Sequence, residues 1–291
     1  MALLSQSVPE DDGEDHLSPA DFARIAKVVT EETGIRLPPA KRLMVEGRLR
    51  RRLRVLEMPT FAAYCNYLFH RDGLEQELMF LINVVTTNKT DFFRELEHFH
   101  LMRSIMVPAL LELRSRERNP LLKLWSAAAS TGAEAYTTAM VMADIAQRQR
   151  NFRFSILGTD ISTDVLEQAQ SGVYPSDQIA PVPAEFQNRY LMWSRKAGLR
   201  PNVRIVPELR RLVQFHRLNL MDETYPYDRD VDIILLRNVL IYFDKTDQAA
   251  VISRLVSHLR PGGYLLLGHS ESMIGTSVSV RQVAPAVFQR V

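Results

Sequence analysis

The chain has 291 residues and a mass of 33.3 kDa, enough for one large domain or two ordinary ones. Hydrophobic residues make up 46% and charged residues 24%, average globular values that argue against wholesale disorder, a collagen-like repeat and a disulfide scaffold. The single cysteine, Cys65, excludes an internal disulfide and a cysteine-based zinc site, and we expect it to be a small buried hydrophobe. Without a signal peptide or an apolar run near the roughly 20 residues that cross a bilayer, the chain is expected to be cytoplasmic and not membrane-inserted.

The net charge of +2 is unevenly distributed along the chain. Residues 1–17 are polar and lack an apolar period, so we expect a disordered acidic tail. Residues 41–54 hold seven bases against the single acid Glu46, which gives this segment a charge of +6. Such a concentration suggests an acidic partner: a nucleic acid, a membrane surface or a carboxylate-rich protein. The acids of the tail are Glu10, Asp11, Asp12, Glu14 and Asp15.

Residues 18–85 are predicted to form a small all-helical domain. Ser18 can cap the first helix and Gly34 can end it. The second helix begins near Pro39 and carries its basic residues on faces other than its apolar stripe, so the basic cluster should be an exposed helical surface. Two more helices are expected at 60–69 and 73–84, and residues 86–119 should hold a linker helix at 99–116. The stripe of the second helix consists of Val45, Leu49, Leu53 and Leu56.

Strands and helices alternate after residue 120, which predicts an α/β domain with a parallel sheet and helices on both faces. Residues 172–211 interrupt the alternation, and we interpret them as an inserted subdomain with small strands at 190–193 and 203–206. The fifth strand of the main sheet should follow a turn at residues 261–263. Strands are expected at 121–127, 154–159, 212–218, 231–236 and 263–268, helices at 134–147, 163–170 and 246–259, and a terminal hairpin at 277–283 and 286–291.

The turn after the first strand, residues 127–134, consists mainly of small residues. Open α/β sheets bind ligands beyond the carboxyl ends of their strands, and small residues let a ligand approach the backbone there. Gly132 is the only glycine of this turn, so it is not the dinucleotide fingerprint that holds a pyrophosphate. Glu134 could receive an amino group at the helix start, although complementing the helix dipole is an equally good interpretation.

Asp160 ends the second strand, where an acid can accept both hydroxyls of an adenosine ribose. The alternative is a cap on the following helix, but Ser162 or Thr163 can serve that purpose. Together, Glu134 and Asp160 suggest a cationic, ribose-bearing ligand without phosphates. S-adenosylmethionine fits these demands.

Four separated motifs follow one another along the chain: residues 86–95, 128–140, 159–174, and 236–244 with the later 268–271. In this order they resemble the chemotaxis receptor methyltransferases, the CheR family, over about residues 18–291. The resemblance implies a Rossmann-like class I methyltransferase sheet with a small N-terminal all-helical domain and an inserted small β-subdomain. It also implies methyl transfer from S-adenosylmethionine to glutamate side chains, in the cytoplasmic helical region of transmembrane chemoreceptors.

The same resemblance assigns residues to roles. Arg94 and Tyr242 should face the reacting methyl group as catalytic residues, and no metal is expected. Ala133 and Ala135 stand where the family commonly has Glu and Pro, which puts cofactor affinity in question more than chemistry. We expect a monomer. The basic residues expected to attract glutamate-rich receptor helices are Arg48, Arg51 and Arg52, and the residues expected to surround the cofactor are Asn88, Thr90, Arg94, Glu134, Asp160, Asn219, Leu220, Arg237 and Asn238.

Two other functions compete with this interpretation. A nucleic-acid methyltransferase could use the basic helix on phosphates, but residues 237–240 lack the Asn or Asp followed by Pro, Pro and an aromatic that is typical of base-amino methylation. A non-catalytic cofactor-binding regulator is disfavoured because Arg94 and Tyr242 are present. His269 is interpreted as structural. Whether a receptor C-terminal peptide docks on the inserted subdomain stays open, because Gly198 is the only glycine of residues 190–209.

Overall fold

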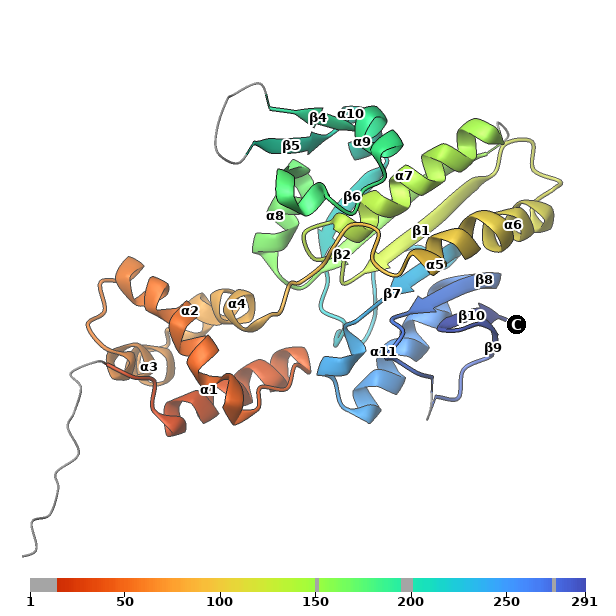
Figure 1. Cartoon of the computed structure of the whole chain (residues 1–291). Helices are drawn as coiled ribbons and strands as arrows, with labels where there is room; N and C mark the ends of the chain where they lie inside the picture. Colours follow the sequence, from red (N-terminus) through yellow and green to blue (C-terminus); the bar gives the residue numbers. More distant parts are fainter. Residues whose placement is uncertain (1–14, 150–151, 195–200, 274–275) are drawn as a thin grey trace, which may run out of the picture. The chain divides into compact units, whose positions relative to one another are not determined.

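The computed structural model of the chain describes residues 15–149, 152–194, 201–273 and 276–291 (Figure 1). It separates into a helical unit, residues 1–31 and 37–85, and an α/β unit, residues 32–36 and 86–291. Each unit has a hydrophobic core of its own. No helix within the described ranges combines the length and the apolar character needed to cross a membrane.

The helical unit contains the four predicted helices. Ser18 Oγ accepts a hydrogen bond from the Asp21 amide at 3.0 Å, as expected of a cap, and Gly34 follows the first helix with a φ of +70°. Three residues of the predicted stripe are buried, whereas Leu56 is half-buried just after its helix. Cys65 is buried, as expected. The helices are α1 (Pro19–Thr33), α2 (Arg42–Val55, after a 3₁₀ turn at Pro39–Lys41), α3 (Phe61–His70) and α4 (Leu74–Val85).

The prediction of a disordered tail is wrong for its last residues, while residues 1–14 lie outside the described ranges. Leu17 is fully buried, and its amide donates to Oε2 of the buried Glu46 at 3.1 Å. The Asp15 carboxylate accepts a hydrogen bond from the Phe61 amide at 2.7 Å. The helical unit therefore begins before residue 18, because these segments satisfy each other's buried polar groups.

Arg52 was expected on the exposed basic surface, and that expectation is wrong. Its guanidinium donates to both carboxylate oxygens of Glu77, at 2.8 and 2.5 Å, and the Tyr64 hydroxyl donates to the same carboxylate at 3.1 Å. Glu77 is only 2% exposed and needs a charged partner. The hydrogen bond to Glu77 raises the pKa of Arg52. Arg48 and Arg51 are exposed, as predicted.

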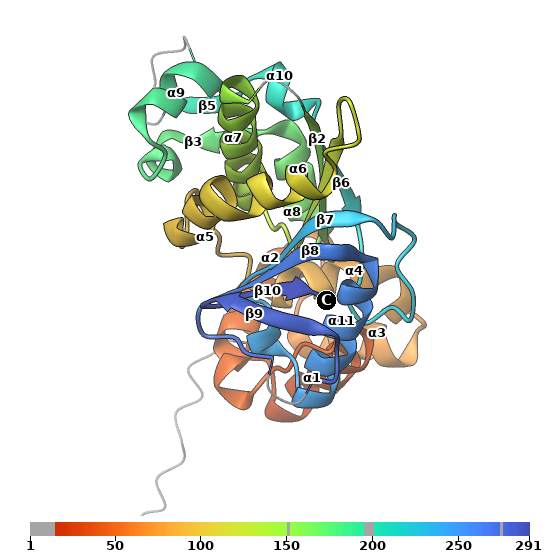
Figure 2. The same ribbon diagram turned by 90° about the vertical axis from the view of Figure 1, so that its right-hand side faces the viewer.

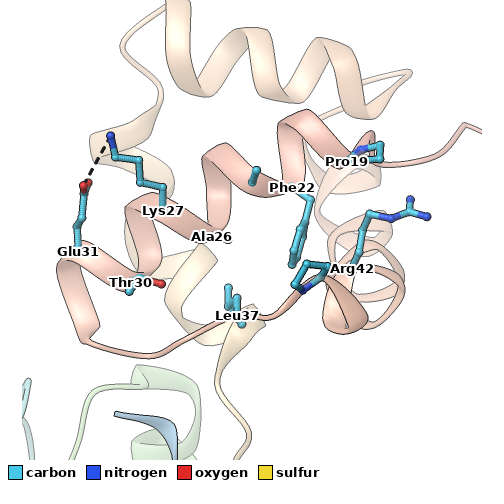
Figure 3. Close-up of a pocket in the computed structure, with 10 residues that line it drawn as sticks. Pro19, Phe22, Ala26, Lys27, Thr30, Glu31, Leu37 and Arg42 are labelled. Atoms are coloured by element: carbon cyan, nitrogen blue, oxygen red, sulfur yellow. Dashed lines mark ion pairs between the residues drawn. The ribbon is translucent and has the colours of Figure 1, made fainter. Parts of the chain in front are cut away.

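A hollow of about 670 Å³ lies on the surface of the helical unit (Figure 3). Phe22 and Leu37 contribute apolar surface to it, and Lys27 pairs with Glu31 across 3.8 Å beside it. Arg42 belongs to its lining, but the basic residues proposed for substrate recognition do not. The shape of the unit therefore gives no support of its own to that assignment.

The α/β unit confirms the predicted fold class. Within the described residues, seven strands form one sheet in the order β6-β2-β1-β7-β8-β10-β9, in which β6 to β8 are parallel and the last two pairs are antiparallel. All residues of β7 are buried, as expected for a central parallel strand. The strands are β1 (Leu121–Ala127), β2 (Arg153–Asp160), β6 (Val213–Arg217), β7 (Val231–Leu236), β8 (Leu259–Leu267), β9 (Val280–Ala284) and β10 (Val287–Arg290).

Helices cover both faces of this sheet (Figure 2). One core joins α7 (Ala133–Arg148) and α8 (Thr163–Ser171) to one face, and the other core joins α11 (Lys245–His258) to the opposite face. Alternate residues of the central strands β1 and β7 enter different cores: Leu124 and Ile233 lie with α7, whereas the neighbouring Trp125 and Ile234 lie with α11.

Two boundaries differ from prediction. The predicted linker helix begins earlier and is built of α5 (Leu96–Leu101), a π-helical turn (Met102–Met106) and α6 (Val107–Leu113). The predicted turn at 261–263 instead belongs to the start of β8, where the pairing register with β7 shifts. Gly262 has a φ of +81° there, so the glycine accommodates an irregular strand rather than a turn.

The inserted subdomain contains both predicted strands and one that was not predicted. In the part of it that the structure describes, β3 (Val173–Pro175), β5 (Asn202–Ile205) and β4 (Leu191–Trp193) form an antiparallel sheet in that order. The subdomain also contains elements that were not predicted: a 3₁₀ turn (Ser176–Ile179) and two short helices, α9 (Ala184–Tyr190) and α10 (Pro207–Arg210). Gly198, on which the question of peptide docking turned, lies outside the described residues.

The Arg52–Glu77 pair should be important for the stability of the helical unit. We expect Glu77→Ala to lower its free energy of unfolding by about 3 kcal/mol, because removing one partner leaves a partly buried charge without compensation. Glu75→Ala, at an exposed position of the same helix, should change it by less than about 0.5 kcal/mol. Urea unfolding of the full chain, followed by circular dichroism, measures both. Equal midpoints for the two variants would contradict the assignment.

Candidate active site

The sheet order brings the predicted acids to one edge. Glu134 follows β1, Asp160 ends β2, and Arg237 follows β7, and these three strands are adjacent and parallel in the order β2-β1-β7. Their carboxyl ends therefore meet on one side, where α/β sheets bind ligands. As predicted, Glu134 lies in the first turn of the helix after the first strand and Asp160 ends the second strand, and the sheet order shows that these strands are neighbours.

Asp160 holds the backbone around it. It is 8% exposed, and its carboxylate accepts hydrogen bonds from the amides of Ser130 (2.8 Å) and Ser162 (3.0 Å). Burial raises the pKa of Asp160, although these amides oppose the shift. Of the two side chains expected to cap α8, Ser162 and Thr163, the Ser162 hydroxyl does not do so and has no partner among the described residues. Asp160 therefore joins the turn after β1 to the start of α8, and ribose binding would be an additional role.

The turn after β1 adopts an unusual backbone conformation. Ala128, Ser130 and Gly132 have φ values of +66°, +50° and +86°. The left-handed region is costly for residues with a Cβ, and such residues gather at functional sites. At Gly132, a Cβ would also come within 2.9 Å of the Ala169 Cβ on α8. The glycine is therefore required both by the turn and by close packing.

The motif at 86–95 packs against this turn and against α7. The Ser130 hydroxyl donates to the Asn88 carbonyl at 2.8 Å, and the Phe93 amide donates to the Thr137 hydroxyl at 3.1 Å. Phe92 is buried beside Phe93. Through Ser130, the structure brings the predicted residues Asn88 and Asp160 to the same turn.

Arg237 lies between two carboxylates. Its side chain is 2% exposed, and its guanidinium donates to Glu134 at 3.0 Å and to Glu95 at 3.1 Å. It also donates to the Arg94 carbonyl. Ser126 donates to the second oxygen of Glu134 at 2.7 Å. Arg237 was predicted as a cofactor residue, and in the structure it fixes the position of Glu134.

Glu95 is a site residue that the prediction missed, although it belongs to the first motif. It accepts hydrogen bonds from Arg237 and, at 3.4 Å, from the Asn238 side chain. Burial alone would raise the pKa of Glu95, but Arg237 and the other donors outweigh burial and lower it. The adjacent His98 is buried, and burial lowers its pKa to about 4. The signal in the sequence was an acid directly after the predicted catalytic arginine.

Glu271 is a second missed residue. Its carboxylate accepts hydrogen bonds from three backbone amides, those of Asn238 (2.9 Å), Leu240 (2.8 Å) and Gly268 (2.7 Å). Burial raises the pKa of Glu271, although the amides oppose the shift. Glu271 thus ties the end of β8 to the turn after β7. That turn leads into a 3₁₀ helix, Leu240–Tyr242, which carries the predicted catalytic tyrosine.

The remaining predicted residues are positioned as follows. Arg94, Thr90 and Tyr242 are half-buried, and Leu220 is buried after β6. The Asn219 side chain donates to the Glu32 carbonyl at 2.6 Å and accepts from the Met221 amide at 3.0 Å, so it supports the local backbone. The two alanines at the start of α7 that depart from the common family pattern, Ala133 and Ala135, are both buried in the core. The basic residues Arg48, Arg51 and Arg52 belong to the helical unit.

The hydrogen-bond acceptors at this edge fit S-adenosylmethionine. Two carboxylates, Glu134 and Asp160, lie at the ends of adjacent strands, where they can accept from an amino group and from ribose hydroxyls. The turn between them holds a single glycine and no cation for a phosphate. The arrangement therefore suits a nucleoside ligand without phosphates, as the sequence predicted.

Comparisons with known proteins identify the family of the chain. Residues 20–86 match the family described as CheR methyltransferase, all-alpha domain, and residues 88–287 match the CheR methyltransferase, SAM binding domain. The chain is 38% identical over 276 residues to chemotaxis protein methyltransferase 2 of Pseudomonas aeruginosa, which covers 94% of each chain. It is 39% identical over 259 residues to the chemotaxis protein methyltransferase of Escherichia coli, covering 88% of this chain and 85% of that one. A relative from Borreliella burgdorferi with the same description is 35% identical over 271 residues, which covers 93% of this chain and 94% of that one.

These matches favour neither a nucleic-acid methyltransferase nor a non-catalytic regulator. They extend over both units of the structure, and their ranges contain nearly all residues of the four motifs. The chain belongs to the CheR methyltransferase family, whose S-adenosylmethionine-dependent methylation serves chemotaxis.

Proposed function

We propose that this protein transfers the methyl group of S-adenosylmethionine to glutamate side chains of chemoreceptors, giving glutamate methyl esters and leaving S-adenosylhomocysteine. The single observation that supports it most is the network at the strand ends, in which Arg237 joins Glu134 to the motif segment 86–95. The name of the relatives, chemotaxis protein methyltransferase, supports a substrate within chemotaxis.

A glutamate acceptor sets modest chemical demands on the protein. Its side chain is already ionised at neutral pH, so no strong general base is needed. The cofactor supplies a methyl group on a positively charged sulfonium. Because the reaction neutralises opposite charges, the protein helps most by excluding water and by holding the acceptor oxygen in line.

Different residues of the chain are assigned to these tasks. Arg94 can orient the acceptor carboxylate, and the Tyr242 hydroxyl can donate a hydrogen bond near the reacting centre. Arg237 positions Glu134, and Glu271 positions the turn that carries Asn238 and leads to Tyr242. Asp160 could accept hydrogen bonds from the ribose hydroxyls of the cofactor.

The acceptor is tested by methylation of receptor-bearing membranes with cofactor labelled in its methyl group. Alkaline release of the label as volatile methanol identifies a carboxyl ester, whereas base-stable label would contradict a glutamate acceptor.

Tyr242→Phe should lower kcat and leave the affinity for S-adenosylhomocysteine unchanged, because it removes only a hydroxyl. Arg94→Ala should change both quantities, since Arg94 can touch both ligands. A Tyr242→Phe protein with unchanged kcat under chemistry-limited conditions would remove this tyrosine from the reaction.

Asp160 is tested by the affinity for S-adenosylhomocysteine. Asp160→Ala should weaken binding about tenfold to a hundredfold, because a hydrogen bond to a charged group contributes about 1.5–3 kcal/mol. Asp164→Ala, at an exposed position of α8, is the matched control and should bind normally. Titration calorimetry measures both proteins, with circular dichroism as a check on folding. Unchanged affinity of a folded Asp160→Ala protein would exclude the proposed role.

The exposed part of the basic helix is proposed to attract glutamate-rich receptor helices. We expect Arg48→Glu with Arg51→Glu to raise the receptor KM and to leave S-adenosylhomocysteine affinity unchanged. Arg52 is left intact because it pairs with Glu77. Lys27→Glu with Arg71→Glu makes the same change in net charge at other exposed positions of the helical unit and should have little effect. Initial rates at varied receptor concentration measure KM.

Equal KM values for the two double variants would show that α2 contributes only net charge. The residual activity of the Arg48 and Arg51 variant should also be less sensitive to salt, because screened charge attraction is what it has lost. Loss of nucleic-acid binding at physiological salt, without any receptor methylation by the unmodified protein, would favour the nucleic-acid alternative instead.

A further inference from the structure

Next to Arg237, Glu95 also lies beside two histidines that have no role in the proposed methyl transfer. His98 on α5 and His269 after β8 flank Glu95 from two sides. Nδ1 of His98 is 3.5 Å from Oε2 of Glu95, and Nε2 of His269 is 3.9 Å from the same oxygen. One ligand atom from each residue lies within 4.8 Å of the other two.

His98 gives a second, independent observation. It is 1% exposed, and its two ring nitrogens have no hydrogen-bond partner among the residues that the structure describes. A neutral imidazole has one N–H and one lone pair. Leaving such a buried group without a hydrogen bond costs about 1–3 kcal/mol. Two unpartnered nitrogens on one buried imidazole therefore indicate that a ligand binds there.

We propose that Glu95, His98 and His269 bind a divalent cation of the zinc class. Two imidazoles and one carboxylate are a common ligand set for zinc with an open fourth position. Bonds of about 2.0–2.2 Å in a tetrahedral site place ligand atoms roughly 3.4 Å apart. The observed separations of 3.5 and 3.9 Å come close to this value. The His269 side chain is 52% exposed, which gives the cation access from solvent.

The cation and Arg237 compete for one carboxylate oxygen. Nη2 of Arg237 donates to Oε2 of Glu95 at 3.1 Å, the same oxygen that both imidazoles approach. A cation bound there weakens the pair with Arg237 and thereby disturbs Glu134. Cation binding should therefore lower the affinity for S-adenosylhomocysteine. This consequence rests on the proposed role of Glu134, whereas cation binding itself does not.

Direct binding is tested on the full chain after treatment with a chelator. We expect calorimetric titration with ZnCl₂ to show one cation per chain, and Co²⁺ to give the visible absorption of a four-coordinate site. His269→Ala should weaken Zn²⁺ binding at least about tenfold, since even outer-shell changes cost that much. His100→Ala is the matched control, because this histidine lies on the same helix as His98, is 70% exposed and pairs with Glu97. It should bind Zn²⁺ like the unmodified chain.

Failure to bind Zn²⁺, or equal binding by the His269→Ala and unmodified proteins, would overturn the proposed site. His98→Gln should abolish Zn²⁺ binding. If this variant does not fold, the comparison of His269→Ala with the unmodified chain tests the site alone.

The competition is tested separately by S-adenosylhomocysteine affinity with and without Zn²⁺. A decrease in the unmodified chain that is absent in His269→Ala supports it, and the reciprocal titration must give the same factor. Unchanged affinity in saturating Zn²⁺ would overturn the competition with Arg237.

Discussion

A guanidinium buried between two carboxylates, Arg237 between Glu95 and Glu134, is the interaction on which the site depends. It joins three parts of the chain: the motif before the linker helix, the start of α7 and the end of β7. A buried charge is tolerated only when it is paired and its remaining donors are used, and Arg237 also donates to the Arg94 carbonyl. Losing either carboxylate would therefore affect the other, because their common partner would lose half of its compensation.

Strained backbone surrounds this network. Phe93, Glu95 and Asn238 have φ values of +54°, +56° and +61°, each costing about 1–3 kcal/mol for a residue with a Cβ. Each has an anchor that offsets the strain: the Phe93 amide binds Thr137, the Glu95 carboxylate binds Arg237, and the Asn238 amide binds Glu271. The strain and the anchors together aim side chains from separate motifs at one edge of the sheet.

In the helical unit, too, a buried carboxylate is paired with an arginine, but there the pair serves stability. The basic helix of this unit has one arginine, Arg52, that neutralises the buried Glu77, while Arg48 and Arg51 remain exposed. Charge of one sign on a single helix therefore has two roles, one in stability and one proposed in substrate attraction. Neighbouring positions on a helix point in different directions, so the two roles can alternate along it.

The sequence by itself determined the helices of the helical unit and the central strands of the main sheet. Apolar period and turn residues predicted β1 and β7 with their observed bounds, and placed Glu134 and Asp160 at the edge where they lie. It succeeded there because strand, turn and helix are set by neighbouring residues. The four motifs led to the assignment of the family, and the family matches confirm that assignment.

Only the tertiary structure decided which partner each charge has. Arg237 pairs with Glu95 across 142 positions of the chain, Asn238 with Glu271 across 33, and Arg52 with Glu77 across 25. Periodicity indicates the face of an element on which a residue lies, but not what faces it across the core. Arg52 was therefore expected in solvent, and Glu95 and Glu271 were missed, because the partner of a buried charge is selected by distance in the folded chain.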